Sequence, residues 1–156
     1  MRDGWPMNDV FGIDTNILVY AISKGVEKHG LAKDLVNSIL EGKYNAVICV
    51  QNLNEFIATV TDSRRMTAPL NVLVSINEID KFMHGGIKIF YPKLKTWDIY
   101  KKILKNKPKT KGQIIYDYFL AATLMSNGVN TLITENVKDF EGIKGFRAVG
   151  LTDTIR

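Results

Sequence analysis

The sequence lacks the residues and segments that mark several classes of protein. It contains one cysteine and two histidines, and no apolar run approaches the roughly 20 residues that a membrane-spanning helix needs. Cys49 can form no internal disulfide, and its apolar neighbours predict buried packing rather than nucleophilic chemistry. His29 and His84 show no zinc-ligand spacing. No apolar segment follows the early basic residue as in a signal peptide, so we expect a cytoplasmic protein without membrane contact.

Acidic residues are almost missing between Lys88 and Lys111, where nine lysines stand against the single acid Asp98. The rest of the chain carries twelve basic and fifteen acidic residues, so the net charge of +5 arises in this one segment. A local excess of lysine favours a polyanionic partner such as RNA or DNA. The charges alone are equally compatible with a solvated helix face followed by an exposed loop.

Short apolar runs alternate with segments of helical spacing along the 156 residues. We expect strands at residues 10–14, 46–50, 87–91, 131–134 and 146–149, and helices at residues 16–21, 29–40, 52–61, 70–83, 94–104 and 117–126. This alternation predicts a three-layer α/β/α domain with a mainly parallel central sheet. We take residues 1–9 as a short N-terminal extension and residues 10–156 as a single domain.

Large apolar side chains follow one side of the expected helix at residues 94–104, beginning with Leu94. Because Trp97 and Tyr100 belong to this stripe, we expect them to pack in the core rather than to stack on nucleic-acid bases.

Asp117 is the only charged residue between Ile114 and Met125. A segment so apolar is expected to lie mostly inside the protein, where an ionised carboxylate is costly unless something pairs with it. No lysine or arginine lies within a helical turn of Asp117 on either side. A metal ion is one of the few groups that could neutralise it.

Three further acids lie beside expected strand ends. Asp14 ends the first strand, Glu55 lies in the helix entered from the second, and Asp139 follows the fourth. Each has an ordinary alternative, because Asp14 and Asp139 can cap a helix or turn and Glu55 can be a solvated flank. Ligands of parallel α/β sheets collect beyond the carboxyl ends of the strands, so the acids together predict one site.

Such a cluster needs a cation, because two like charges about 4 Å apart repel by roughly 4 kcal/mol at an effective dielectric constant of about 20. All-oxygen ligands favour Mg²⁺ or Mn²⁺ over zinc. Magnesium keeps several waters and binds substrate phosphate, which suits it to activate water and stabilise the leaving oxygen in phosphodiester hydrolysis.

Four segments resemble the acidic motifs of PIN-domain nucleases in order and spacing: FGIDTNILVYA at residues 11–21, QNLNEF at 51–56, YDYFLAA at 116–122 and LITENVKDF at 132–140. The resemblance spans about residues 10–149. Chain length and the segment TDSRRM at residues 61–66 resemble most the VapC-type toxins, a group of small prokaryotic ribonucleases paired with an antitoxin.

The resemblance implies a Mg²⁺- or Mn²⁺-dependent ribonuclease in which Asp14, Glu55 and Asp117 hold the metal and its attacking water. Asp139 would assist directly or through water. Many members of the family carry an aspartate where this chain has Asn136, which still offers a neutral oxygen.

The resemblance also implies supporting residues and partners. The residues that would orient the ligands are Thr15, Asn16, Thr134 and Asn136, and the candidate RNA contacts are Arg64, Arg65, Lys101, Lys102, Lys105, Lys109 and Lys111. By the same resemblance, a cognate antitoxin would cover the acidic pocket, and the protein would be a homodimer.

Two alternatives come from other classes of function. Asn136 keeps open a non-catalytic RNA- or partner-binding module that retains the fold with a weakened fourth site. Magnesium-dependent phosphatase and phosphoacceptor domains also place an aspartate after the first strand, but Asn16 stands where dehalogenase-type phosphatases have a second acid. A receiver domain would also require a lysine after a late strand, which the residues Thr134, Glu135 and Asn136 do not supply.

Overall fold

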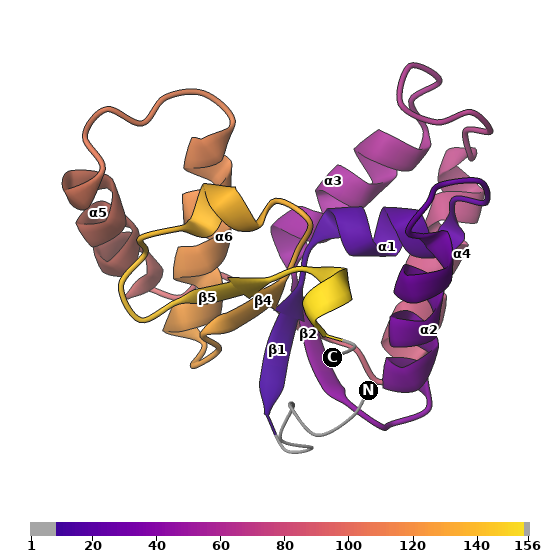
Figure 1. Cartoon of the computed structure of the whole chain (residues 1–156), viewed down its shortest axis with the longest axis horizontal. Coiled ribbons are helices and arrows are strands. Elements are labelled where there is room, and N and C mark those ends of the chain that lie inside the picture. Colours follow the sequence, from indigo (N-terminus) through magenta and orange to yellow (C-terminus); the bar gives the residue numbers. More distant parts are fainter. Residues whose placement is uncertain (1–8, 155–156) are drawn as a thin grey trace.

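The computed structural model describes residues 9–154 (Figure 1). Within this range five parallel strands form one sheet in the order β3-β2-β1-β4-β5. The strands are β1 (Val10–Ile13), β2 (Asn45–Cys49), β3 (Lys88–Phe90), β4 (Thr131–Ile133) and β5 (Arg147–Val149). The helices are α1 (Thr15–Ile22), α2 (His29–Leu40), α3 (Val50–Val60), α4 (Val72–His84), α5 (Thr96–Asn106) and α6 (Ile114–Ser126), with short 3₁₀ helices η1 (Val137–Phe140) and η2 (Leu151–Asp153).

The sheet separates two hydrophobic cores, because successive strand residues point to opposite faces. Phe11 and Ile48 lie in the core beneath α1 to α4. Val47 and Leu132 lie in the second core, beneath α5 and α6 (Figure 1). The predicted three-layer α/β/α architecture with a parallel sheet is therefore confirmed. The order of strands and helices follows the sequence-based prediction throughout the described residues.

The predicted burial of the α5 stripe is wrong at its beginning. Leu94 precedes the helix and is fully exposed, and Trp97 is 57% exposed. The helix therefore packs through its later positions, among which Ile103 is buried. Tyr100 is half-buried between these extremes, and its hydroxyl donates a hydrogen bond to the Ile115 carbonyl oxygen at 3.3 Å.

The predicted N-terminal extension, residues 1–9, lies outside the described residues except for Asp9, so its boundary stays a prediction. No helix between residues 9 and 154 is both long and apolar enough to span a membrane.

Gly12 lets helix α6 approach the central strand closely. A Cβ atom at this position would lie 2.7 Å from Leu124 Cδ1 and 3.2 Å from Leu132 Cδ1. Leu124 is completely buried in α6, so it has little room to move away. The absence of a side chain at Gly12 thus sets the distance between β1 and the helix that carries Asp117.

Replacing Gly12 with Ala is expected to lower the free energy of unfolding by about 1–3 kcal/mol, because the added methyl overpacks the core against Leu124. Chemical denaturation measures this loss. In the double variant G12A/L124A the methyl occupies space left by the shortened side chain, so the total loss should be smaller than the sum of the two single losses. Additivity within about 0.5 kcal/mol would show that the two positions do not interact.

Candidate functional site

Asp14 lies at the middle of the sheet's carboxyl edge, directly after β1, which pairs with β2 on one side and β4 on the other. Its backbone is extended, and it is the N-cap of α1. The Thr15 backbone N–H donates to Asp14 Oδ1 at 2.7 Å. The predicted capping role of Asp14 is therefore confirmed, and its role in a metal site stays a prediction.

Three side chains from different parts of the chain also donate to the Asp14 carboxylate. Thr134 Oγ1 donates to Oδ2 at 2.6 Å, Asn16 Nδ2 donates to Oδ2 at 3.2 Å, and Asn52 Nδ2 lies 3.4 Å from Oδ1. Asp14 is only 6% exposed. These bonds fix both carboxylate oxygens at the junction of β1, β4 and α3.

Glu55 reaches the same network from α3. Thr15 Oγ1 donates to Glu55 Oε2 at 3.0 Å and accepts a hydrogen bond from Asn52 Nδ2 at 3.1 Å. Glu55 is itself an exposed residue. Thr15 therefore links an exposed carboxylate to the buried one.

Asn52 was not singled out from the sequence, although it joins the network at Cys49, Asp14 and Thr15. It is fully buried, and its Oδ1 accepts from the Cys49 backbone N–H at 3.3 Å while its Nδ2 faces Asp14 and Thr15. An asparagine at the third position of a helix that begins directly after a strand was the available signal, because such a residue commonly binds the N-cap backbone.

Asp117 lies in the first turn of α6. The sequence predicted that its apolar segment lies mostly inside the protein, but Asp117 itself is only half-buried. The apolar segment packs along the rest of the helix, whereas the first turn opens towards the surface. Among the described residues, no side chain or backbone group donates a hydrogen bond to its carboxylate or pairs with it. The pKa of Asp117 is raised from 3.8 to about 7, mainly by burial and then by the charges of Asp14, Asp139 and Glu55, in that order.

Burial and neighbouring charges also shift the pKa of Asp14. The pKa of Asp14 is raised from 3.8 to about 6 as the net result: burial is the largest cause, the hydrogen bonds from Thr134 and Thr15 lower the pKa, and the charges of Glu55 and Asp139 raise it. The structure therefore brings all four predicted acids into one electrostatic neighbourhood. The excess of negative charge has no compensating ion pair on Asp14 or Asp117 within the described part of the chain.

The spacing of these acids limits how they can hold a cation. Within residues 9–154, no three carboxylate, histidine or cysteine side chains converge closely enough to ligate one metal ion together. A Mg²⁺ or Mn²⁺ ion that keeps several waters and contacts one or two carboxylates directly fits this arrangement, because water can bridge to the others. The hard oxygen donors and their raised pKa values suit such an ion.

The segment after β4 supports the site mainly through Thr134. Its hydroxyl accepts from the Asn136 backbone N–H at 3.0 Å while donating to Asp14. The Asn136 side chain is exposed, so its structural contribution comes from the backbone. Asp139 lies in η1 and is half-buried.

Glu135, which sequence reasoning did not identify, holds this turn in place. Its Oε1 accepts from the Leu151 backbone N–H at 2.9 Å, and its Oε2 pairs with Lys28. An acid between two predicted site residues gave no separate signal in the sequence, because its partners are distant along the chain.

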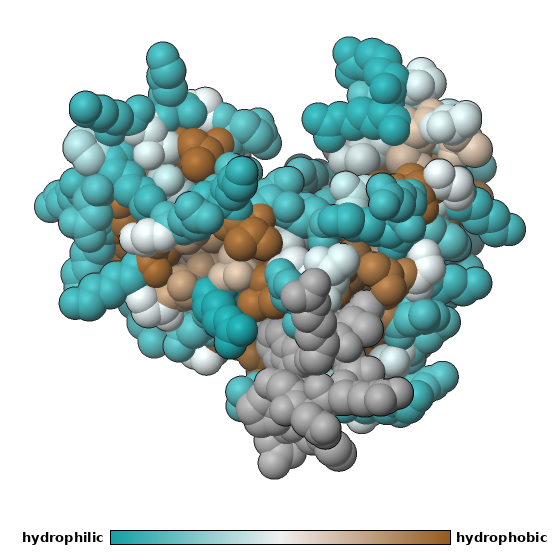
Figure 2. Space-filling model, in the orientation of Figure 1, coloured by the Kyte–Doolittle hydropathy of each residue, from teal (hydrophilic) through white to brown (hydrophobic). Residues whose placement is uncertain are grey.

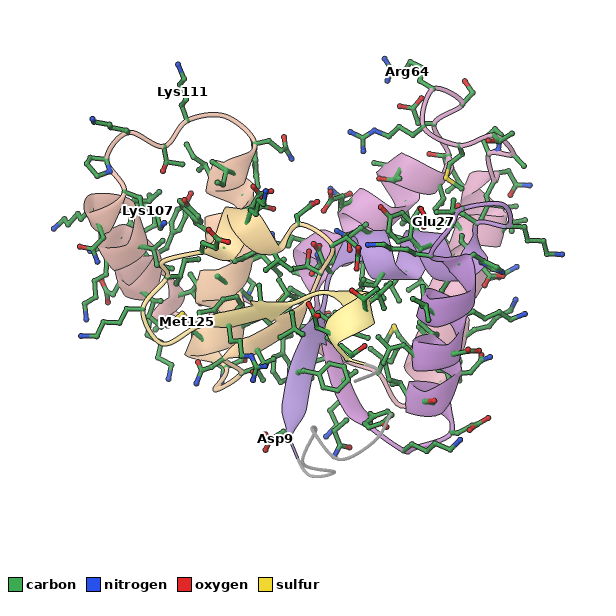
Figure 3. The ribbon with its side chains drawn as sticks, viewed as in Figure 1. Asp9, Glu27, Arg64, Lys107, Lys111 and Met125 are labelled. Carbon is green, nitrogen blue, oxygen red and sulfur yellow. The ribbon has the colours of Figure 1, made fainter. Side chains whose placement is uncertain are left out.

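The candidate RNA contacts lie on two loops and on helix α5. Arg64 extends from the loop between α3 and α4, and Lys111 from the loop between α5 and α6, at the same end of the molecule (Figure 3). Figure 2 shows a hydrophilic surface that is hollowed between these two raised parts. Arg64 pairs with Asp62 at 2.9 Å, and Arg65 donates to Thr59.

The remaining candidates follow α5 and its loop. Lys101 pairs with Asp98 at 2.9 Å and lies over the Trp97 ring. The others are exposed: Lys102, Lys105, Lys109 and Lys111.

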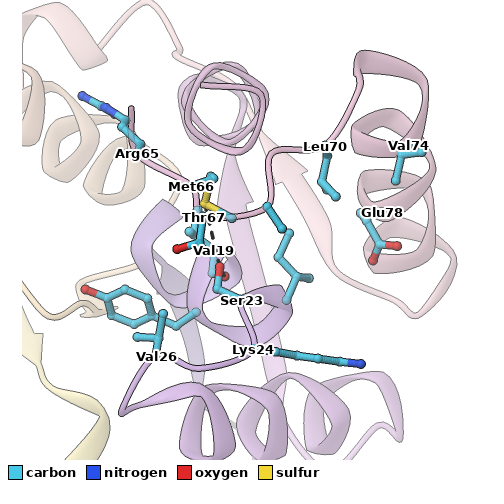
Figure 4. A pocket seen from close by; sticks show the side chains of 13 residues that line it. Val19, Ser23, Lys24, Val26, Arg65, Met66, Thr67, Leu70, Val74 and Glu78 are labelled. Atoms are coloured by element: carbon cyan, nitrogen blue, oxygen red, sulfur yellow. Dashed lines mark hydrogen bonds between the residues drawn. The ribbon is translucent and has the colours of Figure 1, made fainter. Parts of the chain in front are cut away.

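An apolar cavity of about 480 Å³ lies beside α1, away from the four acids (Figure 4). Val19, Met66 and Leu70 line it, and Arg65 lies at its edge. Helix α4, which contributes Val74 and Glu78 to this cavity, also exposes the apolar side chains of Val72, Leu73 and Ile76. This surface resembles a contact area for another macromolecule more than a site of chemistry.

Comparison with known proteins identifies the family. The model of the family described as PIN domain matches residues 12–145. No curated protein matches the chain in a sequence comparison.

Solved structures with the same fold include several toxin–antitoxin proteins. The DNA-bound VapBC structure from Salmonella typhimurium is 20% identical with a TM-score of 0.66, covering 92% of this chain and 98% of that chain. VapBC2 from Rickettsia felis, bound to a promoter DNA fragment, is 21% identical with a TM-score of 0.64, and the coverages are 90% and 98%. VapC20 from Mycobacterium tuberculosis, described as a sarcin–ricin loop cleaving toxin, is 12% identical with a TM-score of 0.57, and the coverages are 80% and 87%.

Without divalent metal, the free energy of unfolding is expected to fall as the pH rises from about 4 to about 7. Because the pKa of Asp117 is raised from 3.8 to about 7 in the folded state, the folded protein keeps a proton that the unfolded chain has lost. Asp117→Asn removes this contribution without removing a hydrogen bond, so this variant should lose less stability with rising pH. Urea denaturation in EDTA between pH 4 and pH 8 measures the difference. Asp34→Asn, at an exposed acid of α2, is the matched control, and an equal slope in wild type and Asp117→Asn would contradict the account.

Proposed function

The chain belongs to the PIN-domain family, and from this premise we propose that it is a divalent-metal-dependent ribonuclease that hydrolyses phosphodiester bonds of RNA. The observation that carries the proposal is the gathering of Asp14, Glu55, Asp117 and Asp139 at the carboxyl edge of the sheet. The charges of the other three raise the pKa of Asp117, which pairs with no cation in the described chain. A bound cation would relieve this repulsion.

In this proposal Asp14, Glu55 and Asp117 hold a Mg²⁺ or Mn²⁺ ion and its attacking water, while Asp139 assists directly or through water. When bound, the ion supplies an activated water and charge stabilisation for the leaving oxygen. Substrate phosphate would complete its shell, as is common for magnesium.

The protein supplies the fixed positions of these acids. Thr134, Asn16 and Asn52 hold Asp14 through the hydrogen bonds described above, and Thr15 connects it to Glu55. Positioning residues around metal ligands commonly change metal affinity or activity by about 10–100-fold when they are removed. Asn136 would contribute through its backbone N–H to Thr134, and its exposed amide remains free to offer an oxygen.

The basic residues on the two raised loops would bind RNA through its phosphates. Arg64 stands on one side of the hollow, and Lys111 stands on the other (Figures 2 and 3). Arg65 follows Arg64 in the same loop, and the other candidate lysines belong to α5 and the loop after it. Contacts of this kind set affinity and salt dependence more than sequence choice. RNA lying across the hollow would bring a phosphodiester to the acids.

We also propose that the protein is the toxin of a toxin–antitoxin pair. The structural neighbours described as VapBC complexes motivate this proposal. The apolar cavity beside α1 and the exposed Val72, Leu73 and Ile76 of α4 offer a surface that an antitoxin would cover. A neighbouring reading frame for a small DNA-binding protein would identify the partner.

A second candidate function is a non-catalytic RNA- or partner-binding module. Two observations favour it: Asn136 replaces an acid that many relatives carry, and no three ligating side chains converge within the described residues. Such a module would still bind RNA through its basic loops but would not cleave it.

Cleavage of mixed single-stranded RNA is expected to require Mg²⁺ or Mn²⁺ and to stop in EDTA. Asp14→Asn and Asp117→Asn should each reduce the rate by at least about 100-fold, because each removes a proposed metal ligand, while Asp34→Asn should cleave as wild type does. Isothermal titration with Mn²⁺ checks in parallel that the two site variants bind metal more weakly. Absent cleavage, or cleavage that neither site variant changes, would favour the non-catalytic module.

Sedimentation velocity is expected to give one species at the dimer mass, because the family resemblance implies a homodimer and the exposed apolar residues of the chain need cover. A single species at the monomer mass of 17.6 kDa across the accessible concentration range would contradict the proposed homodimer.

A further inference from the structure

A second cavity, outside the acidic site, combines a basic rim with an apolar floor. It has a volume of about 290 Å³ and lies between α5, the end of α6 and the turn that follows η1. Lys102, Lys107 and Lys144 line it, and no carboxylate does. Three lysines around one small cavity repel one another, so an anion bound between them would be favoured.

The floor of this cavity is formed by aliphatic side chains. Ile103 and Ile143 are buried, while Ile99 and Met125 are half-buried and therefore partly accessible. Asn106, at the end of α5, adds an exposed amide to the rim. A ligand that fits must carry negative charge at one end and a compact apolar body at the other.

Lys107 is the fixed member of the basic rim. Its Nζ donates to the Glu141 carbonyl oxygen at 2.6 Å and lies 5.5 Å from the centre of the Tyr118 ring. Lys107 thus connects α5 to the turn after η1 and to α6. Figure 3 shows Lys107 and Met125 on the same side of the molecule, by α5 and α6.

A neighbouring cavity connects this site with the beginning of α6. It has a volume of about 480 Å³, shares Asn106 and Lys107 with the first, and is also lined by Lys109 and Tyr118. Tyr118 directly follows Asp117 in the chain. The neighbouring cavity therefore extends from the lysine-rimmed cavity to Ile114 and Tyr118 near the beginning of α6.

We propose that the lysine-rimmed cavity binds one nucleotide of single-stranded RNA, at a distance from the bond that is cut. The base lies on the aliphatic floor, and its phosphate lies between Lys102, Lys107 and Lys144. The Asn106 amide can donate to and accept from the edge of the base. This inference rests on the proposed ribonuclease function and extends the RNA path beyond the acidic site.

A single nucleotide suits the cavity better than a segment of a protein partner does. Its volume of about 290 Å³ lies at the low end of small-molecule sites and is too small for a packed helix. A nucleotide also places its charge and its flat apolar ring at opposite ends, as the lining does.

Binding of AMP to the full chain in EDTA tests the proposal without any contribution from a bound metal. Calorimetry should show AMP binding more tightly than adenosine or inorganic phosphate, with NMR shifts at Gly142 and Lys144. The double variant K102Q/K144Q should weaken AMP binding by at least about tenfold, since each lysine contact to a phosphate is lost. Met125→Trp, which fills the floor and keeps every charge, should also weaken it.

The matched control is K88Q/K138Q, which removes two exposed lysines that do not line the cavity. It should bind AMP as wild type does. Equal weakening in this control, equal affinity for phosphate and AMP, or no AMP binding would each overturn the proposal. An acidic peptide that binds where AMP does not would assign the cavity to a protein partner instead.

These measurements distinguish failure of the ribonuclease proposal from failure of the cavity proposal. If AMP binds but RNA is not cut, the ribonuclease proposal fails and the nucleotide cavity stands. If RNA is cut and AMP does not bind, the cavity proposal fails alone. In an active enzyme, K102Q/K144Q should raise KM for RNA more than it lowers kcat, because the cavity lies away from the acids.

Discussion

The repulsion among four carboxylates at one edge of the sheet is the constraint on which the rest of the site depends. Asp14 is buried, and every acid near it opposes its ionisation. Four donors aimed at its two oxygens offset part of that cost, and they come from Thr15, Asn16, Asn52 and Thr134. Because these residues belong to three separate segments, the carboxylate is held only when β1, α3 and β4 are assembled. Folding and formation of the site are thus one event.

The same constraint explains why the acids differ in their surroundings. Asp14 is fixed and buried, whereas Glu55 is exposed and Asp117 is half-buried without a hydrogen-bond partner in the described chain. Under the proposed function, one rigid carboxylate with more accessible neighbours would suit a hydrated ion, which keeps several waters in its shell. Gly12 affects the position of Asp117, because the absence of a side chain there lets α6 approach the central strand closely. Hydrogen bonds thus fix the position of Asp14, whereas packing at Gly12 fixes the distance between β1 and the helix that carries Asp117.

Much of this arrangement could be predicted from the sequence, because it follows from local patterns. Alternating apolar runs and helical spacing identified the parallel α/β architecture, and acids after strands indicated where charge would gather. The exposure of Trp97 and the half-buried state of Asp117 could not be read in this way, since each depends on where a helix begins relative to its neighbours. The partners of Glu135, Lys28 and Leu151, are distant in sequence and could not be predicted from it. For Asn52 the sequence indicated only the local bond to the Cys49 backbone, and not the contact with the distant Asp14.

The two raised loops, between α3 and α4 and between α5 and α6, are structurally separate from the hydrogen bonds that hold Asp14. Their basic side chains flank the hollow above the acids, yet none of the hydrogen bonds that hold Asp14 comes from either loop. Changes in the loops would therefore leave the hydrogen bonds that hold Asp14 intact. Descendants of one ancestor could acquire new targets through loop changes alone, while the sheet edge stays under separate selection.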